Sequence, residues 1–247
     1  MPMVQSGEVS AFSVEPTGEV RGGLILIHEI WGLADHIKDV ACRFAEQGYL
    51  VLAPDLLSGI GITPEVGEQL TRLRASGQSE RTAGQPNMRE IMAPIQAPEY
   101  VAWAVPTLVS VVDELAAAER VAGRIGVTGF CFGGSYSFAL AQADGRIRAC
   151  VPFYGAPPQL DMVGDISCPV LAFYGDTDSR LVEGLPEVTA AMSDASVTFT
   201  AKVYPDVGHA FFNDTNPDAY DAGSAADAWR LTLAFLAQNL GRGQNQR

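Results

Sequence analysis

The chain has 247 residues, of which 47% are hydrophobic and 18% are charged, and its formal net charge is −13. This length suffices for one large domain with its own core, and the hydrophobic content excludes a disordered chain. The acidic balance argues against nucleic acid or an anionic membrane as partner, because both require a basic face. A small anionic substrate held by one local arginine remains compatible with this charge.

The amino-terminal residues have no basic segment followed by an apolar one, so we expect no secretory signal. No apolar run approaches the roughly 20 residues that a bilayer span needs, so we expect no membrane association. The four cysteines, Cys42, Cys131, Cys150 and Cys168, include no C-x-x-C pair. We therefore expect no disulfide framework, no metal and no cofactor. A reactive thiol favours a reducing compartment, and we expect a cytoplasmic monomer or weak homodimer.

The elements alternate between strands and helices. In chain order they are strand 9–14, strand 22–28, helix 35–47, strand 49–53, helix 65–75, helix 103–120, strand 125–128, helix 134–143, strand 147–154, strand 169–174, helix 181–192, strand 197–204 and helix 224–239. The nearly continuous apolar run at 22–28 is typical of a strand buried on both faces. Asp35 is expected to cap the first helix, and Gly48 to end it.

This alternation predicts an α/β fold, with a mostly parallel twisted sheet of about seven or eight strands and helices on both faces. Residues 1–240 form a single domain in this interpretation. The irregular stretch 76–98, rich in Gly, Gln, Pro and Met, is a candidate lid or pocket wall, because long irregular connections in compact domains are usually functional. The polar tail 241–247 is expected to fray. Active sites of such sheets lie at the carboxyl ends of the strands.

The most informative motif is Gly129-x-Cys131-x-Gly133, placed between a predicted strand and a predicted helix. This is the layout of a nucleophile elbow, with a thiol where a serine usually sits. Cβ atoms at the two glycines would collide with neighbouring backbone in so sharp a turn. The turn also places the Phe132 N–H at a helix N-terminus, where it can stabilise an oxyanion. A buried structural cysteine beside a tight turn is the alternative.

A nucleophilic thiol needs a base and a group that orients the base. His209 follows the last predicted strand, whereas His36 falls in the first turn of a helix and is expected to be solvated. His28 ends a buried strand, where a structural role is at least as probable as a catalytic one on residue type alone. The chain order Cys, Asp, His favours Asp178 as the orienting acid, with Asp176 shaping its turn by bonding local backbone N–H groups.

The loop after strand 22–28 should supply the second oxyanion donor, and the N–H of Ile30 is the candidate. Glu29 in the same loop could take the Cys131 proton, or hold the thiol protonated until substrate binds. Its alternative is a surface carboxylate or a structural ion-pair partner.

Together these residues resemble the dienelactone hydrolase family of α/β hydrolases. The matching motifs run in family order and are His28-Glu29-Ile30-Trp31-Gly32, Ala53-Pro54-Asp55-Leu56, Gly129-Phe130-Cys131-Phe132-Gly133-Gly134, Tyr174-Gly175-Asp176-Thr177-Asp178 and Gly208-His209-Ala210-Phe211. The resemblance implies a triad of Cys131, His209 and Asp178, an oxyanion hole from the amides of Phe132 and Ile30, and a Glu29 that hydrogen-bonds the resting thiol.

The chain departs from the family pattern at the positions that bind the carboxylate of the substrate. Family members that bind the carboxylate of dienelactone carry an arginine four residues after the catalytic histidine, where this chain has Asn213. Candidates for a second arginine are Arg72, Arg74 and Arg81. The residues expected to contact substrate are Trp31, Arg81, Phe211 and Asn213.

The predicted function is hydrolysis of an activated ester or lactone, such as a dienelactone-like enol-lactone, through a cysteine acyl-enzyme. A broad carboxylesterase or thioesterase on the same scaffold is the nearest alternative. A non-catalytic binding protein with a vestigial triad is a further one. A metal-dependent hydrolase fits poorly, because no residues have ligand spacing.

Overall fold

The computed structural model describes residues 3–75, 90 and 92–241 of the chain. The strands of this part are β1 (Met3–Ser6), β2 (Val9–Val14), β3 (Gly22–Ile27), β4 (Tyr49–Pro54), β5 (Ile125–Phe130), β6 (Ile147–Phe153), β7 (Val170–Gly175) and β8 (Phe199–Tyr204). Its helices are α1 (Asp35–Glu46), α2 (Pro64–Ala75), α4 (Pro98–Ala117), α5 (Phe132–Ala143), α6 (Ser179–Val182), α7 (Leu185–Asp194) and α8 (Ala222–Leu240). Short 3-10 helices occupy η1 (Ser58–Ile60), η2 (Ala93–Gln96) and η3 (Leu160–Asp165).

The described strands form one eight-stranded sheet in the order β1-β2-β4-β3-β5-β6-β7-β8. β2 pairs antiparallel with both β1 and β4, whereas all pairs from β4 across to β8 are parallel. Helices provide the crossovers, for example α1 between β3 and β4 and α5 between β5 and β6. The expected mostly parallel sheet is confirmed, and its parallel strands end at one common edge.

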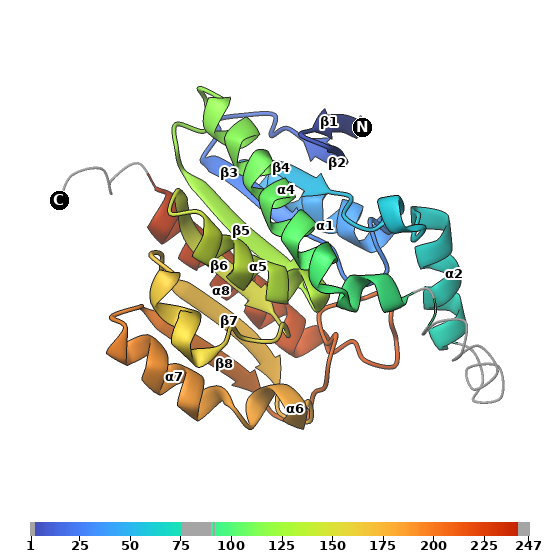
Figure 1. Cartoon of the computed structure of the whole chain (residues 1–247), viewed down its shortest axis with the longest axis vertical. Helices are drawn as coiled ribbons and strands as arrows, with labels where there is room; N and C mark the ends of the chain where they lie inside the picture. Colours follow the sequence, from blue (N-terminus) through green and yellow to red (C-terminus); the bar gives the residue numbers. More distant parts are fainter. Residues whose placement is uncertain (1–2, 76–89, 91, 242–247) are drawn as a thin grey trace.

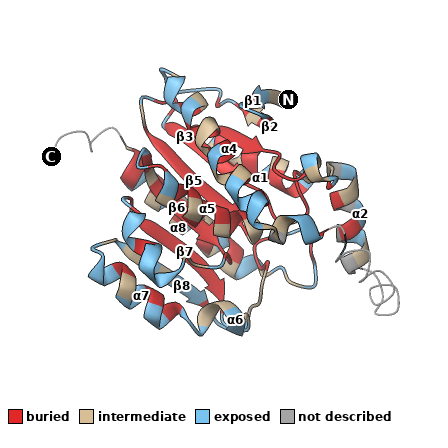
Figure 2. Cartoon of the chain, viewed as in Figure 1, coloured by how far each residue is buried: buried red, intermediate tan, exposed pale blue. Residues whose placement is uncertain are grey.

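Each face of the sheet carries its own core. On one face α4, α5 and α7 pack through residues that include Val111, Leu140 and Val188. On the other face α1 and α8 pack through residues that include Val40 and Leu236. Figure 1 shows α4 and α5 in front of the strands and α8 behind them, and Figure 2 shows the central strands in the colour of buried residues. Burial on both faces explains why β3 and β5 are apolar almost throughout.

Several element boundaries differ from the sequence expectations. The helix expected at 181–192 is split into α6 and α7, which are separated at Glu183 and Gly184. Asp35 is the first residue of α1 rather than its cap, because Ala34 occupies the cap position and makes no side-chain bond. β1 was not predicted, since four residues at a chain end give too short a pattern to interpret.

The long helix α4 starts earlier than expected and contains Pro106. Among the described residues it alone is long and apolar enough to cross a membrane by length and composition. Tyr100, Leu108 and Leu115 on this helix are nevertheless buried in the core. The apolar character of α4 therefore also suits its place as a core helix of the sheet.

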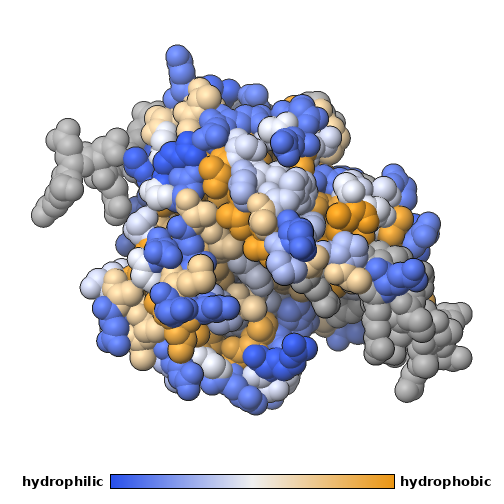
Figure 3. Space-filling view, viewed as in Figure 1, coloured by the Kyte–Doolittle hydropathy of each residue, from blue (hydrophilic) through white to orange (hydrophobic). Residues whose placement is uncertain are grey.

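The surface mixes polar and apolar residues. On the face shown in Figure 3, hydrophobic residues form separate patches among hydrophilic ones. Large hydrophobic side chains that are exposed in the described part are Met3, Val101, Leu160, Met162, Val203 and Tyr220. Of the candidate lid, residues 76–89 and 91 lie outside the described residues, as does most of the tail, 242–247.

Candidate active site

Cys131 occupies the sharp turn between β5 and α5. Its backbone has φ 56° and ψ −113°, a left-handed conformation that is rare for a residue with a side chain. A Cβ at Gly129 would overlap the carbonyl of Gly133, and one at Gly133 would overlap the carbonyl of Ile27 in β3. The glycines of the motif are thus required by close backbone approach, which confirms the steric expectation. Such strain in a turn is a mark of functional sites.

The turn also orders the amides that follow Cys131. The Cys131 N–H is bonded to the Phe153 carbonyl of β6 at 3.0 Å, which fixes the elbow against the neighbouring strand. Phe132 is the first residue of α5, and the first amides of a helix have no carbonyl partner within it. Its ring stacks on His28 and packs against Tyr136. The Phe132 amide is therefore held at the positive end of α5.

His209 and Asp178 are joined by a short hydrogen bond. Nδ1 of His209 lies 2.6 Å from Oδ2 of Asp178, and the aspartate side chain is 15% exposed against 38% for the histidine. Asp178 immediately precedes α6 but its side chain makes no capping bond there, so the carboxylate is available to the imidazole. This pairing leaves Nε2 as the nitrogen that is free to serve a substrate or a thiol.

The Asp178 turn is held by backbone and by a hydroxyl rather than by Asp176. The Asp176 N–H bonds the Tyr204 carbonyl, and the Thr177 hydroxyl bonds the Val207 carbonyl at 2.9 Å. The Asp176 side chain is exposed. The expectation that this side chain shapes the turn was therefore wrong, because the adjacent strand β8 and the loop after it supply the partners.

One open cavity of about 760 Å³ is bordered by five of the expected residues, and Glu29, which was also expected to act on the thiol, does not line it. Its lining, here called the Cys131 cavity, is formed by Ile30, Cys131, Phe132, Ser135, Tyr154, Ala156, Asp178, Arg180, Leu181 and His209. The thiol, the imidazole, the carboxylate and both candidate oxyanion residues thus border the same space, contributed by loops at the carboxyl ends of four strands.

The other cysteines are in different surroundings. Burial raises the pKa of Cys168 to about 12 and that of Cys150 well above its usual value, and it also raises the pKa of Cys42 on α1. None of these three lines the Cys131 cavity. A raised pKa disfavours the thiolate, which is the nucleophilic form. In the described residues no group of three His, Cys, Asp or Glu could hold a metal ion.

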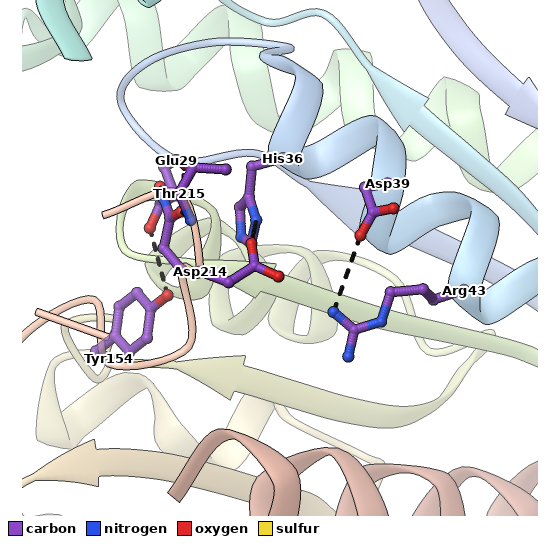
Figure 4. A network of polar contacts seen from close by, with 8 residues as sticks. Glu29, His36, Asp39, Arg43, Tyr154, Asp214 and Thr215 are labelled. Atoms are coloured by element: carbon purple, nitrogen blue, oxygen red, sulfur yellow. Dashed lines mark hydrogen bonds and ion pairs between the residues drawn. The ribbon is translucent and has the colours of Figure 1, made fainter. Parts of the chain in front are cut away.

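Glu29 is a buried carboxylate with its own donors. Only 3% of the residue is exposed. Its Oε1 accepts from the Tyr154 hydroxyl at 3.3 Å, and its Oε2 accepts from Asn213 Nδ2 at 2.7 Å. Figure 4 shows Tyr154 pointing at Glu29 while the loop that carries Asp214 and Thr215 passes alongside. The reading of Glu29 as a surface carboxylate is excluded by this burial.

His28 is structural in its contacts. Its Nε2 accepts from the Leu56 N–H at 3.1 Å, so Nδ1 carries the proton and donates to the Glu29 carbonyl at 2.7 Å. Desolvation by complete burial lowers the pKa of His28. The neutral ring thereby fixes, through two hydrogen bonds to backbone groups, the start of the loop that contains Glu29 and Ile30.

His36 is buried, and the expectation that it would be solvated was wrong. It is 5% exposed, and its Nδ1 lies 3.2 Å from Asp214 Oδ1. Its ring packs edge-on against Phe130 and Phe212. The first turn of α1 rotates this side chain toward the sheet, which residue type alone cannot reveal.

The residues expected to contact substrate are divided among different places. Trp31 and Asn213 do not line the Cys131 cavity but a second, smaller cavity of about 220 Å³, here called the Glu29 cavity, together with Glu29, His36 and Arg72. Phe211 is fully buried against Tyr154 and Tyr204, so its predicted contact with substrate is corrected to a core role. Arg81 lies outside the described residues, and so does the side chain of Arg74.

Sequence reasoning missed Tyr154, Ser135, Arg180 and Leu181 among the residues that line the Cys131 cavity. Tyr154 follows directly after β6 and has φ 37°, and its ring centre lies 5.0 Å from that of His209. A position immediately after a parallel strand was the available signal, because such positions meet at the edge of the sheet where ligands bind.

Comparison with known proteins identifies the family of the chain. The dienelactone hydrolase family matches the chain over residues 9–240. A protein of Saccharolobus solfataricus described as a "putative carboxymethylenebutenolidase" is 31% identical over 245 residues, covering 93% of each protein. A protein of Escherichia coli K12 with the same description is 30% identical over 233 residues, covering 89% of this chain and 78% of that protein.

Solved structures give the same result. A "putative dienelactone hydrolase" from Klebsiella pneumoniae superposes with a TM-score of 0.76 at 28% identity, covering 93% of both chains. A dienelactone hydrolase-like promiscuous phosphotriesterase from metagenomic libraries, at 22% identity and a TM-score of 0.67 over 95% of each chain, shares the fold. The chain belongs to the dienelactone hydrolase family of α/β hydrolases, and it is a hydrolase of carboxylic esters or lactones.

Proposed function

We propose that Cys131 is the nucleophile of this hydrolase and that the reaction passes through an acyl-thioester on its sulfur. The observation that carries the proposal is the left-handed Cys131 at a glycine-flanked elbow, on the same cavity as the bonded pair His209 and Asp178. A structural cysteine needs neither the strained backbone nor the neighbouring imidazole.

In this mechanism Glu29 accepts the Cys131 proton, and the thiolate attacks the carbonyl carbon of the substrate. The carbonyl oxygen becomes an oxyanion, which accepts hydrogen bonds from the Ile30 and Phe132 amides; loss of one such donor typically costs about 2.7–4 kcal/mol of transition-state stabilisation. The bond to the leaving oxygen then breaks, which leaves the acyl group on sulfur.

His209 takes a proton from water as the resulting hydroxide attacks the thioester, and Asp178 holds the imidazole in the tautomer with its proton on Nδ1. The thiolate departs with its electron pair and takes back the proton that Glu29 accepted. His209 gives the proton it took from water to the oxygen of the departed leaving group, directly or through solvent, and both products leave. Water thus supplies the oxygen of the new carboxylate, and no further reactant is needed.

Sulfur as the nucleophile limits the substrate. A thiolate leaves a tetrahedral intermediate more readily than an ordinary alkoxide does, so the intermediate returns to substrate unless the substrate's own leaving group is stabilised. Enol-lactones, aryl esters and thioesters meet this condition, whereas alkyl esters and amides do not. We therefore infer an activated ester or an enol-lactone such as a dienelactone as the substrate class.

Replacement of Cys131 tests the nucleophile. Cys131→Ala should abolish turnover of 4-nitrophenyl acetate, and Cys131→Ser should keep the fold while losing most activity, because an alkoxide needs stronger base help. Cys42→Ala is the matched control, since this half-buried cysteine lies on α1 and does not line the Cys131 cavity. Wild-type activity in either Cys131 variant, with circular dichroism unchanged, would place the nucleophile elsewhere.

A broad carboxylesterase or thioesterase is the second candidate, favoured by the size of the Cys131 cavity and by its apolar wall of Ile30, Phe132 and Leu181. Rates on a dienelactone, on 4-nitrophenyl esters of increasing chain length and on acyl-thioesters separate the two. Dominance of the dienelactone supports a lactonase, and comparable rates across the panel support the broad enzyme.

A further inference from the structure

The buried carboxylate of Glu29 is held from both sides. Its two oxygens accept from different residues, Tyr154 after β6 and Asn213 in the loop after His209. A carboxylate with so little exposure depends on such donors, because burial without hydrogen bonds disfavours its charged form. The position of this carboxylate is therefore fixed by the two donors and by the contacts that hold them.

Asn213 has only one workable orientation. Its Oδ1 accepts from the Thr215 N–H at 3.0 Å and from the Thr215 hydroxyl at 2.7 Å. Both are donors, so this end of the amide must be the oxygen, and the Nδ2 end must face Glu29. The same loop is tied to α1 one residue further on, where Asp214 meets His36. Figure 4 shows His36 facing Asp214, with Glu29 and Thr215 beside them.

Tyr154 connects Glu29 and Asn213 with the Cys131 cavity. Its hydroxyl meets Glu29, while the residue lines the Cys131 cavity and its ring packs on His209. Asn213 itself does not line that cavity. Glu29 does not line it either, so the influence of Asn213 on the reaction must pass through the contact between Glu29 and Tyr154.

We propose that Asn213, held in orientation by Thr215, is the positioning residue that holds the Glu29 carboxylate against the hydroxyl of Tyr154, the one residue of the three that lines the Cys131 cavity. The inference rests on the proposed function, in which Glu29 accepts the Cys131 proton. Titratable and charged groups on the surrounding elements are Tyr154 and, around the Glu29 cavity and the loop beside it, Asp35, His36, Arg72 and Asp214. These groups are unchanged in the variants below.

The decisive variants are Asn213→Asp and Thr215→Val, read by the pH profile of kcat/KM for 4-nitrophenyl acetate. Asn213→Asp replaces a donor by a second carboxyl group of the same shape, and two adjacent carboxyls share a proton. The acid limb of the profile should move to higher pH by about one unit, which is a tenfold loss of activity on that limb. Thr215→Val removes the hydroxyl donor to Asn213 Oδ1 and keeps the backbone N–H donor, so it holds the amide less firmly and should shift the limb in the same direction by less.

Alkylation of Cys131 by iodoacetamide gives a second reading, and its pH dependence should shift in the same direction as that of kcat/KM. Matched controls are Asn239→Asp, whose amide bonds the Phe235 carbonyl on α8, and Thr107→Val, whose hydroxyl bonds the Trp103 carbonyl on α4. Both remove a comparable bond far from Glu29, so they should lower thermal stability and leave both pH profiles in place.

The proposal is overturned if Asn213→Asp and Thr215→Val lose stability like the controls while both pH profiles stay at their wild-type positions. If Asn213→Asp fails to fold, the pH profiles of Thr215→Val alone decide whether the proposal holds. Failure of the proposed function is distinguishable, because it appears as full activity in Cys131→Ala, whereas failure of this inference leaves turnover dependent on Cys131.

Discussion

His28 shows how one buried side chain can make stability depend on pH. Both ring nitrogens bond backbone groups, and complete burial lowers the pKa of the imidazole below 6.5. Protonation would place a proton on Nε2, where the Leu56 N–H now donates. The ring therefore stays neutral in the folded chain under conditions in which the unfolded chain takes up a proton.

Because the pKa of His28 is lower in the folded than in the unfolded chain, proton binding is linked to stability. We predict that neutral His28 stabilises the fold above pH 6.5 and that this contribution is lost as the pH falls toward the lowered pKa of the folded state. Between these two pKa values the unfolded state binds more protons than the folded state. Each unit by which the pH is lowered therefore reduces the free energy of unfolding by at most about 1.4 kcal/mol for this one group. Urea titrations of wild type and His28→Gln between pH 5 and 7.5 measure it. Equal slopes in both proteins would assign the pH dependence to other groups.

Residue types and chain order predicted which side chains meet at the Cys131 cavity better than they predicted the contacts that support them. Cys131, Asp178 and His209 could be placed on one cavity because strand ends and chain order constrain them strongly. The partners of Glu29 could not, because a carboxylate's donors come from loops whose path no local pattern encodes. Asn213 was expected at the substrate, and the structure turns it toward Glu29 instead.

At the scale of elements, the turn between β5 and α5 depends on how closely it approaches β3. A Cβ on Gly133 would meet the carbonyls of Ile27 and His28, which are backbone atoms and cannot rotate away. Gly133→Ala should therefore lower the free energy of unfolding by about 3 kcal/mol or more, through forced backbone movement. Activity should fall with it, since the same turn positions Cys131.

Gly59→Ala is the matched control, because no atom lies within 4 Å of its added Cβ. It should change the free energy of unfolding by less than about 1 kcal/mol. Urea denaturation of both variants compares them directly. Similar stability of the Gly133 and Gly59 variants would mean that the elbow can relax and that its glycines are not sterically required.

The long elements with a regular apolar pattern were predicted correctly, whereas the split of the helix expected at 181–192 into α6 and α7 was missed. Strands such as β3 and β5 are apolar on both faces and reveal themselves as continuous runs. The break between α6 and α7 carries a local signal that the prediction of one helix over 181–192 passed over, because Gly184 is the cap of α7 and Pro186 stands in its first turn.

At the scale of the whole molecule, the alternation of strands and helices was sufficient to predict a mostly parallel sheet covered on both faces. It was not sufficient for the strand order, because pairing such as β3 between β4 and β5 is decided by contacts far apart in the sequence. The function of the fold follows from this order. It places the ends of β3, β5, β6 and β7, and the loop after β8, around one cavity.

The central claim is that an acyl group is carried on the sulfur of Cys131. His209→Ala should slow the hydrolysis of that thioester, so brief reaction with 4-nitrophenyl acetate should leave one acetyl group per chain. Intact-mass spectrometry followed by peptide mapping detects it. The account predicts a single acetyl adduct on the peptide that contains Cys131; an adduct on another residue, with Cys131 unmodified while product is released, would contradict it.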